Sequence, residues 1–212
     1  MKIVERLRRS YKINAAIRIA TRGLSPVILG YRRITLPYKV RYRSDLRIHF
    51  GCGKLFDPRF FNVDALPFKH VHYVTGSPLM PVLRAQSAEL IYACHVFEHI
   101  SHRQQLDVLK RWYELLKPGG QIMLSVPDFA KIVEVYMRGA LPFDQIQDGL
   151  MGGQDYPGNF HFALFTPDHL TGLLEKAGFS NIRGWRSRDQ ENWPRDWSWA
   201  EWISLNLKAE KI

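Results

Sequence analysis

The chain has 212 residues, of which 46% are hydrophobic and 24% are charged, and its formal net charge is +10. This composition predicts one globular domain with a buried core and excludes a disordered chain. Two cysteines are too few for a disulfide scaffold or a four-thiolate zinc site, and no apolar run approaches the length of a membrane span. Because the basic start of the chain has no continuous apolar stretch of signal-peptide type, we expect a cytoplasmic protein.

The positive charge is concentrated at the start of the chain. Residues 1–45 hold twelve Lys and Arg against two acidic residues, whereas residues 46–212 hold equal numbers of both. We therefore expect a basic N-terminal arm over residues 1–45 and one domain over residues 46–212. Nucleic acid is disfavoured as a partner, because binding to phosphates requires a basic surface on the domain itself.

The arm begins with a predicted helix over residues 1–21, followed by an extended segment. Its apolar residues fall roughly on one side of the helix, and its arginines lie elsewhere. The apolar residues are Ile3, Leu7, Ile13, Ile17 and Ala20. A basic amphipathic helix can lie on an anionic membrane surface, so residues 1–24 are a candidate for peripheral contact with the inner face of the membrane. The alternative is that this helix packs against the domain.

From residue 46 onward, short β-forming segments alternate with amphipathic helices. Strands are predicted over Leu46–Phe50, Phe60–Val63, His70–Val74, Glu89–Val96, Gln121–Val126, Asn181–Trp185 and Trp199–Leu207. Helices are predicted over His102–Leu116 and Pro167–Lys176, with Thr166 as the N-cap of the second. This alternation is typical of an α/β fold with a mostly parallel sheet and helices on both faces, in which ligands bind beyond the carboxyl ends of the strands.

Two of the predicted strands end in residues suited to a nucleoside ligand. Gly51-Cys52-Gly53 follows the first strand, where glycines let a ligand approach the backbone, and Asp64 follows the second, where an acid can accept hydrogen bonds from a ribose. The dinucleotide pattern G-x-G-x-x-G is not met, because Phe56 stands in the place of its last glycine. A nicotinamide or flavin enzyme is therefore disfavoured.

Further motifs extend this pattern along the chain. In order they are Gly51-Cys52-Gly53, Asn62-Val63-Asp64, His95-Val96-Phe97-Glu98-His99, Leu116-Lys117-Pro118-Gly119-Gly120 and Val126-Pro127-Asp128. As a set they resemble class I S-adenosylmethionine-dependent methyltransferases, and more closely the small predicted methyltransferases grouped with surface-polysaccharide biosynthesis. The resemblance runs from about Leu46 to Phe179 and implies a three-layer, Rossmann-like methyltransferase fold.

The resemblance also implies an activity. It predicts S-adenosylmethionine as the cofactor and methyl transfer to a hydroxyl of a glycan or glycolipid precursor. Two alternatives stay open. One is a protein of this fold that binds the cofactor or a partner without catalysis, and the other is an RNA methyltransferase, for which the basic arm would be suited.

Cofactor-binding roles follow from the resemblance at the ends of the strands. The glycine loop would wrap the methionine and ribose, the acid after the second strand would hold the ribose hydroxyls, and the end of the fourth strand would line the methionine side. In this sequence these residues are Gly51, Cys52, Gly53, Asp64, Cys94 and His95. Ser77 stands where many members have an acid that contacts the adenine amine, and Leu55 replaces a third glycine.

A hydroxyl acceptor must lose a proton during methyl transfer, so a general base is expected. His95, at the end of the fourth strand, is the first candidate, with His99, Asp128 and His161 as the others. His161 closes the glycine-rich segment 152–161, which could cover the acceptor as a lid. Each candidate has a structural alternative: a plain loop histidine at His161 and a helix cap at Asp128. For Glu98-His99, we expect the start of a helix.

Two other groups of residues have simpler interpretations. His70 and His72 alternate on one predicted strand without a carboxylate nearby, so no metal site is predicted, and Cys52 and Cys94 are expected to be buried free thiols. Five of the six tryptophans lie between residues 185 and 202, with two of them alternating on the predicted last strand. They either form a stacking surface for sugars or pack the last two strands.

Overall fold

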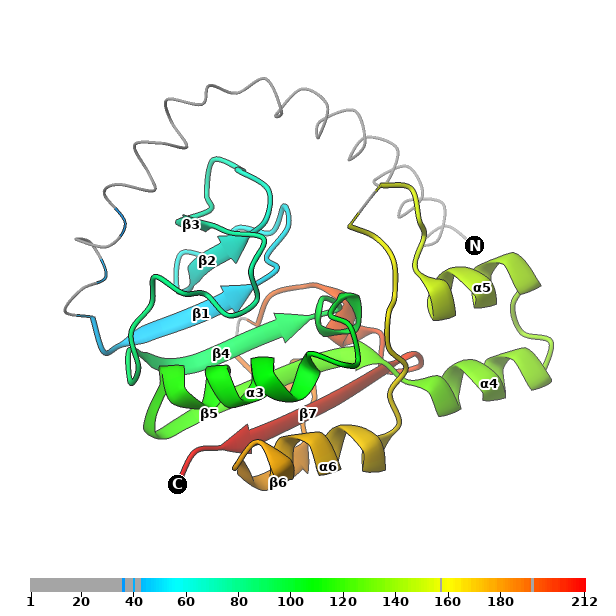
Figure 1. Cartoon of the computed structure of the whole chain (residues 1–212). Helices are drawn as coiled ribbons and strands as arrows, with labels where there is room; N and C mark the ends of the chain where they lie inside the picture. The colour runs from blue at the N-terminus through cyan, green and yellow to red at the C-terminus, as the bar shows by residue number, and fades with distance from the viewer. Residues whose placement is uncertain (1–35, 37–39, 41–42, 157, 192) are drawn as a thin grey trace.

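The computed structural model describes residues 36, 40, 43–156, 158–191 and 193–212. The predicted helix over residues 1–21 and the membrane contact through residues 1–24 therefore lie outside the described residues. Within the described part of the chain, no helix combines the length and the apolar character needed to cross a membrane. Figure 1 shows one twisted sheet with helices packed along it.

The sheet has seven strands in the order β3-β2-β1-β4-β5-β7-β6. Their bounds are β1 Leu46–Phe50, β2 Phe61–Asp64, β3 Tyr73–Val74, β4 Ala88–Cys94, β5 Leu116–Pro127, β6 Ser180–Gly184 and β7 Ser204–Glu210. β7 is antiparallel to both of its neighbours, and the other pairs are parallel. The predicted mostly parallel sheet is confirmed. The strand order reverses between β1 and β4, which is where α/β sheets place their ligands.

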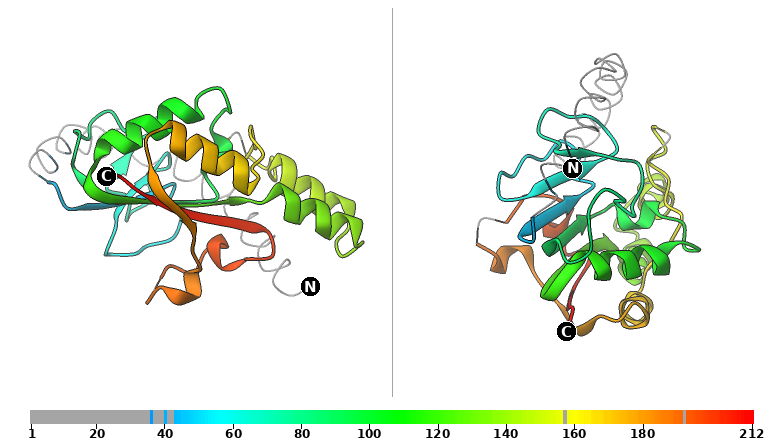
Figure 2. Two further views of the ribbon diagram at one scale, coloured as in Figure 1. Left: turned by 90° about the horizontal axis from the view of Figure 1, so that it is seen from below. Right: turned by 60° about the vertical axis from the view of Figure 1, so that its left-hand side comes forward.

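Two helices cover one face of the sheet, as the edge-on view in Figure 2 shows. They are α3 (Gln105–Leu115) and α6 (Pro167–Lys176). The sheet residues Ile91, Ala93, Ile122 and Leu124 belong to the same buried cluster as Trp112 of α3 and Leu170 of α6. Because side chains alternate along a strand, the residues between them face the opposite side.

The opposite face has a different cover from the one predicted. Its sheet residues Leu90, Tyr92 and Met123 form a second buried cluster with Trp185 and Trp193. In the described part of the chain, the segment after β6 covers this face, with two short 3-10 helices, η2 (Ser187–Asp189) and η3 (Trp197–Trp199), in place of longer helices (Figure 2). The prediction of α-helices on both faces is therefore wrong for the described residues.

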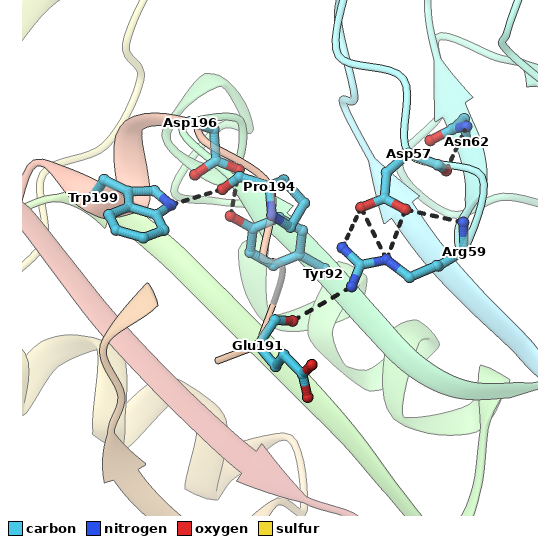
Figure 3. A network of polar contacts seen from close by, with 8 residues as sticks. All are labelled: Asp57, Arg59, Asn62, Tyr92, Glu191, Pro194, Asp196 and Trp199. Carbon is cyan, nitrogen blue, oxygen red and sulfur yellow. Dashed lines mark hydrogen bonds and ion pairs between the residues drawn. The ribbon is translucent and has the colours of Figure 1, made fainter. Parts of the chain in front are cut away.

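Polar contacts hold the segment after β6 against the strands, as Figure 3 shows. The hydroxyl of Tyr92 donates a hydrogen bond of 2.6 Å to Asp196, and Trp199 donates one of 2.8 Å to the carbonyl of Pro194. Asp196 also accepts a hydrogen bond from the backbone of Ser198 and so caps η3. A buried tyrosine needs such a partner, so Asp196 fixes the segment at one place.

The last predicted strand begins too early. β7 starts at Ser204, and Trp197 and Trp199 lie in η3 rather than alternating on a strand. Trp185 and Trp193 are 6% and 8% exposed, which agrees with the packing interpretation. Trp202 is about half exposed and is not part of that packing.

Other elements also differ from the prediction. β5 begins at Leu116 rather than Gln121, because this fully buried residue already pairs with Ala88 of β4. β3 is reduced to Tyr73–Val74, so His70 and His72 do not lie on a strand. The helix α4 (Phe129–Met137) was expected only if Asp128 is a helix cap, and α5 (Phe143–Met151) was not predicted. Both helices extend the structure beyond the carboxyl end of β5 (Figure 1).

Candidate active site at the carboxyl ends of the strands

The loop after β1 folds tightly against its neighbours on one side and is open on the other. Gly51 and Gly53 both have positive φ angles, of 69° and 56°. A Cβ atom on Gly51 would lie 2.4 Å from the side chain of Val96, whereas one on Gly53 would meet nothing within 4 Å. The loop therefore packs against the segment after β4 and leaves space beside Gly53, as a glycine loop that binds a cofactor requires.

Asp64 joins this loop to the end of β2. Its Oδ2 accepts a hydrogen bond of 2.8 Å from the backbone N–H of Gly53, and its Oδ1 accepts one of 2.8 Å from Leu66. A carboxylate accepts hydrogen bonds, which is the chemistry that the hydroxyls of a ribose require. The structure thus brings together the glycine loop and the acid that the sequence assigns to the cofactor.

Three further residues assigned to the cofactor lie at or after the carboxyl ends of strands: Cys52 after β1, Ser77 after β3 and Cys94 at the end of β4. Burial raises the pKa of both Cys52 and Cys94 above the ordinary range of a thiol, with a further contribution from Asp64 at Cys52. Both thiols are free, Cys52 is buried, and Cys94 is partly exposed. Protonated thiols of this kind are weak nucleophiles, which argues against a redox pair. Ser77 is half buried, and its hydroxyl accepts a hydrogen bond of 3.4 Å from Leu79.

His70 supports the glycine loop, a role that the sequence did not indicate. Its Nε2 lies 3.0 Å from the carbonyl oxygen of Gly53 and 3.9 Å from the sulfur of Cys52. Because a carbonyl only accepts, Nε2 carries the hydrogen. His70 thus stabilises the side of the loop away from Asp64.

His95 directly follows β4 and has a left-handed backbone with φ of 48°. Its Nε2 lies 2.8 Å from the hydroxyl of Ser204, and that hydroxyl donates to the carbonyl of Trp197, also at 2.8 Å. Since a serine hydroxyl has one hydrogen, His95 must donate from Nε2 and keep its lone pair on Nδ1. Burial, followed by the nearby His161 and His99, lowers the pKa of His95 to about 3, so the ring is neutral.

Glu98 is the buried acid of the site. It is 1% exposed, its Oε1 lies 3.5 Å from Nδ1 of His95 and 3.9 Å from Nε2 of His161, and neither oxygen has a hydrogen-bond partner among the described residues. Burial raises the pKa of Glu98 to about 8 and, together with His99, lowers that of His161 to about 4.

The sequence suggested a different place for Glu98, at the start of a helix. Instead it lies within the single 3-10 turn η1 (Phe97–His99), and its side chain points into the protein. The sequence feature that could have indicated this cluster is the spacing of His95, Glu98 and His99. Residues three positions apart lie side by side on a tight helical turn.

The glycine-rich segment that carries His161 is tied to the same turn. The Nδ1 of His99 lies 2.9 Å from the carbonyl of Phe160, and the backbone N–H of Phe162 donates a 2.8 Å hydrogen bond to the carbonyl of Glu98. Gly152, with φ of 78°, begins the segment where a Cβ would lie 2.4 Å from the carbonyl oxygen of Asn159. His161 is thereby placed beside Glu98.

Asp128 has the helix-capping contacts that the alternative interpretation predicts. It is 3% exposed, and it accepts hydrogen bonds from the backbone of Ala130 and Lys131 at the start of α4. The ammonium group of Lys131 lies 3.8 Å from the same carboxylate. A role for Asp128 as the base stays a prediction, and its geometry is that of an N-cap.

The comparisons with solved structures support the fold. An N1-methyltransferase of 1,6-didemethyltoxoflavin from Burkholderia thailandensis, solved with that compound and S-adenosylhomocysteine, is 15% identical with a TM-score of 0.53, and the match covers 98% of this chain and 89% of that one. A SAM-dependent methyltransferase from Archaeoglobus fulgidus is 14% identical with a TM-score of 0.51, and the match covers 92% of this chain and 98% of that one.

The comparison with protein families gives the class of the enzyme. No curated protein matches the chain by sequence. Residues 45–183 match the methyltransferase domain family, which is most of the predicted domain and contains every residue assigned above to the cofactor. The chain therefore belongs to the methyltransferase domain family, which confirms the prediction of an S-adenosylmethionine-dependent methyltransferase.

Proposed function

We propose that the protein transfers the methyl group of S-adenosylmethionine to a hydroxyl group of a glycan or glycolipid precursor. The observation that supports a hydroxyl acceptor is the cluster of His95, His99, His161 and buried Glu98 after β4, because O-methylation must remove a proton. The glycan class is supported by the resemblance of the motif set to enzymes of surface-polysaccharide biosynthesis. A lipid-linked acceptor would also suit an arm that contacts an anionic membrane.

The chain's own residues fit the cofactor at the glycine loop. Gly53 offers open space, Asp64 lies beside it at the end of β2, and Gly51 closes the loop against Val96. When bound there, S-adenosylmethionine supplies an electrophilic methyl group. Because the positive charge of the sulfonium disperses during transfer, a preorganised site from which water is excluded contributes much of the rate.

The histidines provide the route for the proton. His95 and His161 are neutral, so each can take a proton from an acceptor, and both lie within 4 Å of Glu98. An ionised carboxylate at this distance stabilises the imidazolium that forms, and the imidazolium in turn favours ionisation of Glu98. The Ser204 hydroxyl holds the ring of His95 in one tautomer, as general-base catalysis requires.

Methyl transfer from radiolabelled S-adenosylmethionine tests this proposal. The acceptors are a lipid-linked oligosaccharide fraction and total RNA, in separate reactions with the full chain. We expect label in the glycolipid, with loss of about 10²–10⁴-fold in rate for His95→Ala or His161→Ala. His169→Ala is the matched control, because His169 is an exposed histidine of α6.

Three outcomes would contradict the proposal. Label in RNA alone would identify an RNA methyltransferase. Absence of label in both fractions, with S-adenosylhomocysteine still bound, would indicate a protein that binds the cofactor without catalysis. Unchanged rates in both histidine variants would remove the histidines from proton transfer.

A further inference from the structure

The residues around Glu98 have the composition of a metal site. Within the part of the chain that the structure describes, Glu98, His99 and His161 are the one group of three metal-ligating side chains whose ligand atoms all lie within 4.8 Å of one another. We propose that these three residues bind a single divalent transition-metal ion, with Zn²⁺ as the preferred ion. The sequence predicted no metal site, because it gave no sign that His161 returns to the turn at Glu98.

The carboxyl group of Glu98 requires a hydrogen-bond partner that the described residues do not supply. The residue is 1% exposed, and neither of its oxygens accepts or donates a hydrogen bond among the described residues. Burial of a carboxyl group without a hydrogen bond is costly, and a bound cation removes that cost. This unpartnered acid, directed toward His161, is the observation that favours a metal over a chance meeting of side chains.

One of the two histidines, His99, is held as metal ligands usually are. Nδ1 of His99 donates to the carbonyl of Phe160 at 2.9 Å, so its Nε2 keeps the lone pair. A hydrogen bond of this kind from the other ring nitrogen is the usual outer-shell contact of a metal-bound histidine. The rings of His99 and His161 lie edge to face with centroids 4.9 Å apart, so both are beside Glu98.

The ligand atoms all lie within 4.8 Å of one another and must move closer together to bind one ion. Tetrahedral zinc, with bonds of about 2.0–2.2 Å, places neighbouring ligand atoms ~3.3 Å apart. The observed separation of Nε2 of His161 and Oε1 of Glu98 is 3.9 Å, so a change of roughly half an ångström brings them into range. Two imidazoles and one carboxylate suit zinc and its first-row neighbours, whereas Mg²⁺ and Ca²⁺ prefer oxygen ligands.

Three protein ligands leave one position of a tetrahedral ion open. Catalytic zinc sites use that position for water or for a substrate oxygen whose pKa the metal lowers. In this respect alone the inference rests on the proposed function, since the acceptor hydroxyl would occupy the open position near His95, whose Nδ1 lies 3.5 Å from Glu98. With the ion bound, His161 and Glu98 are ligands, so His95 alone would take the proton of the acceptor. Binding of the ion does not depend on the identity of the acceptor.

Calorimetric titration with ZnCl₂ tests the site directly, on the full chain without a histidine tag and after treatment with a chelator. We expect one bound ion per chain, and an affinity reduced by about 100-fold or more in Glu98→Gln and in His161→Ala, beyond the usual effect of outer-shell changes. His169→Ala, an exposed histidine, is the control and should bind as the wild type does. No cofactor or acceptor is present, so failure of methyl transfer does not affect the result.

Thermal unfolding gives a second readout, because the melting temperatures of the wild type and Glu98→Gln should differ in opposite directions without and with zinc. Without metal, Glu98→Gln should melt at a temperature equal to or above that of the wild type, because it removes a buried acid with no hydrogen-bond partner. With zinc, the wild type should gain thermal stability and the variant should not. If Glu98→Gln does not fold, the comparison passes to His99→Ala and His161→Ala. The proposal is overturned if the wild type binds no stoichiometric zinc, or if the folded ligand variants bind it unchanged.

Discussion

His95 donates a hydrogen bond from Nε2 to the hydroxyl of Ser204 at 2.8 Å, because the hydrogen of that hydroxyl is already donated to Trp197. The contact joins the end of β4 to the start of β7, which are 109 residues apart in the sequence. It fixes which nitrogen of His95 carries the proton, and so it leaves the Nδ1 lone pair toward Glu98.

Replacement of Ser204 by Ala should therefore affect His95 more than it affects the cofactor. The Nε2–H would lose its acceptor in a buried place, at a cost of about 1–3 kcal/mol in the free energy of unfolding. We expect turnover to fall while the affinity for S-adenosylhomocysteine is kept. Ser204→Thr keeps the hydroxyl and is the control. Stability and turnover equal to the wild type in Ser204→Ala would show that this hydrogen bond does not position the ring.

The two glycines of the loop after β1 should respond differently to the same substitution. Both have a positive φ, so Ala at either position costs about 1–2 kcal/mol in backbone strain. Gly51→Ala also creates a contact of 2.4 Å with Val96, and such overpacking adds about 1–3 kcal/mol.

Urea unfolding of Gly51→Ala, Gly53→Ala and the double variant Gly51→Ala with Val96→Ala measures this difference. The double variant should recover part of the loss, because it removes the contacting methyl groups. Gly53→Ala should instead weaken binding of S-adenosylhomocysteine, since its Cβ enters the open side of the loop. Equal loss of stability in the two single variants would contradict the packing of Gly51 against Val96.

Asp128 allows a direct choice between a helix cap and a general base. As an N-cap of α4, it contributes about 0.5–2 kcal/mol, which Ala removes and Asn largely keeps. We therefore expect Asp128→Asn to have nearly normal stability and turnover, and Asp128→Ala to be less stable. A fall of about 10²-fold or more in turnover for a stable Asp128→Asn would instead identify Asp128 as the base.

His49 should make the stability of the fold sensitive to acid. It is 2% exposed, with its ring packed against Tyr92 and Phe60, and burial lowers its pKa from 6.5 to about 4. Asp196 and Asp57 offset only part of this shift. Between these two pKa values the unfolded chain binds more protons than the folded chain, so stability falls as the pH decreases from about 7 toward 4.

The size of this effect follows from the two pKa values. Between pH 7.5 and pH 5, His49 should account for a loss of about 2 kcal/mol in the free energy of unfolding. His49→Phe keeps an aromatic ring without the titration, so its stability should decrease less over the same range. Urea unfolding of both proteins at the two pH values checks this. An equal decrease in both would mean that His49 is not the group responsible.

The parts of the fold that local sequence determines were predicted well. β1 has the predicted bounds, and α6 begins and ends where Thr166 and Pro167 predict, with the Thr166 hydroxyl accepting a hydrogen bond from the backbone of His169. The glycine loop and Asp64 are also close together, because the carboxyl ends of neighbouring parallel strands share one edge of the sheet.

The parts that depend on distant contacts were missed. Trp197 and Trp199 have the pattern of a strand, but Asp196 caps a 3-10 turn there and is itself held by Tyr92 of β4. Glu98 resembled the start of a surface helix, and its burial depends on the return of His161 after 62 intervening residues. The order of residues within a short stretch of sequence does not indicate the contact of Asp196 with Tyr92 or that of Glu98 with His161.

We propose that the edge formed by the glycine loop and Asp64 binds S-adenosylmethionine. Calorimetric titration of the full chain with S-adenosylhomocysteine tests it most directly, by comparison of wild type, Asp64→Ala and the exposed control Asp189→Ala. We expect Asp64→Ala to lose about 1.5–3 kcal/mol of binding free energy, which is about 10–150-fold in affinity, and Asp189→Ala to bind normally. A folded Asp64→Ala with the affinity of the wild type would place the cofactor elsewhere and contradict the site described above.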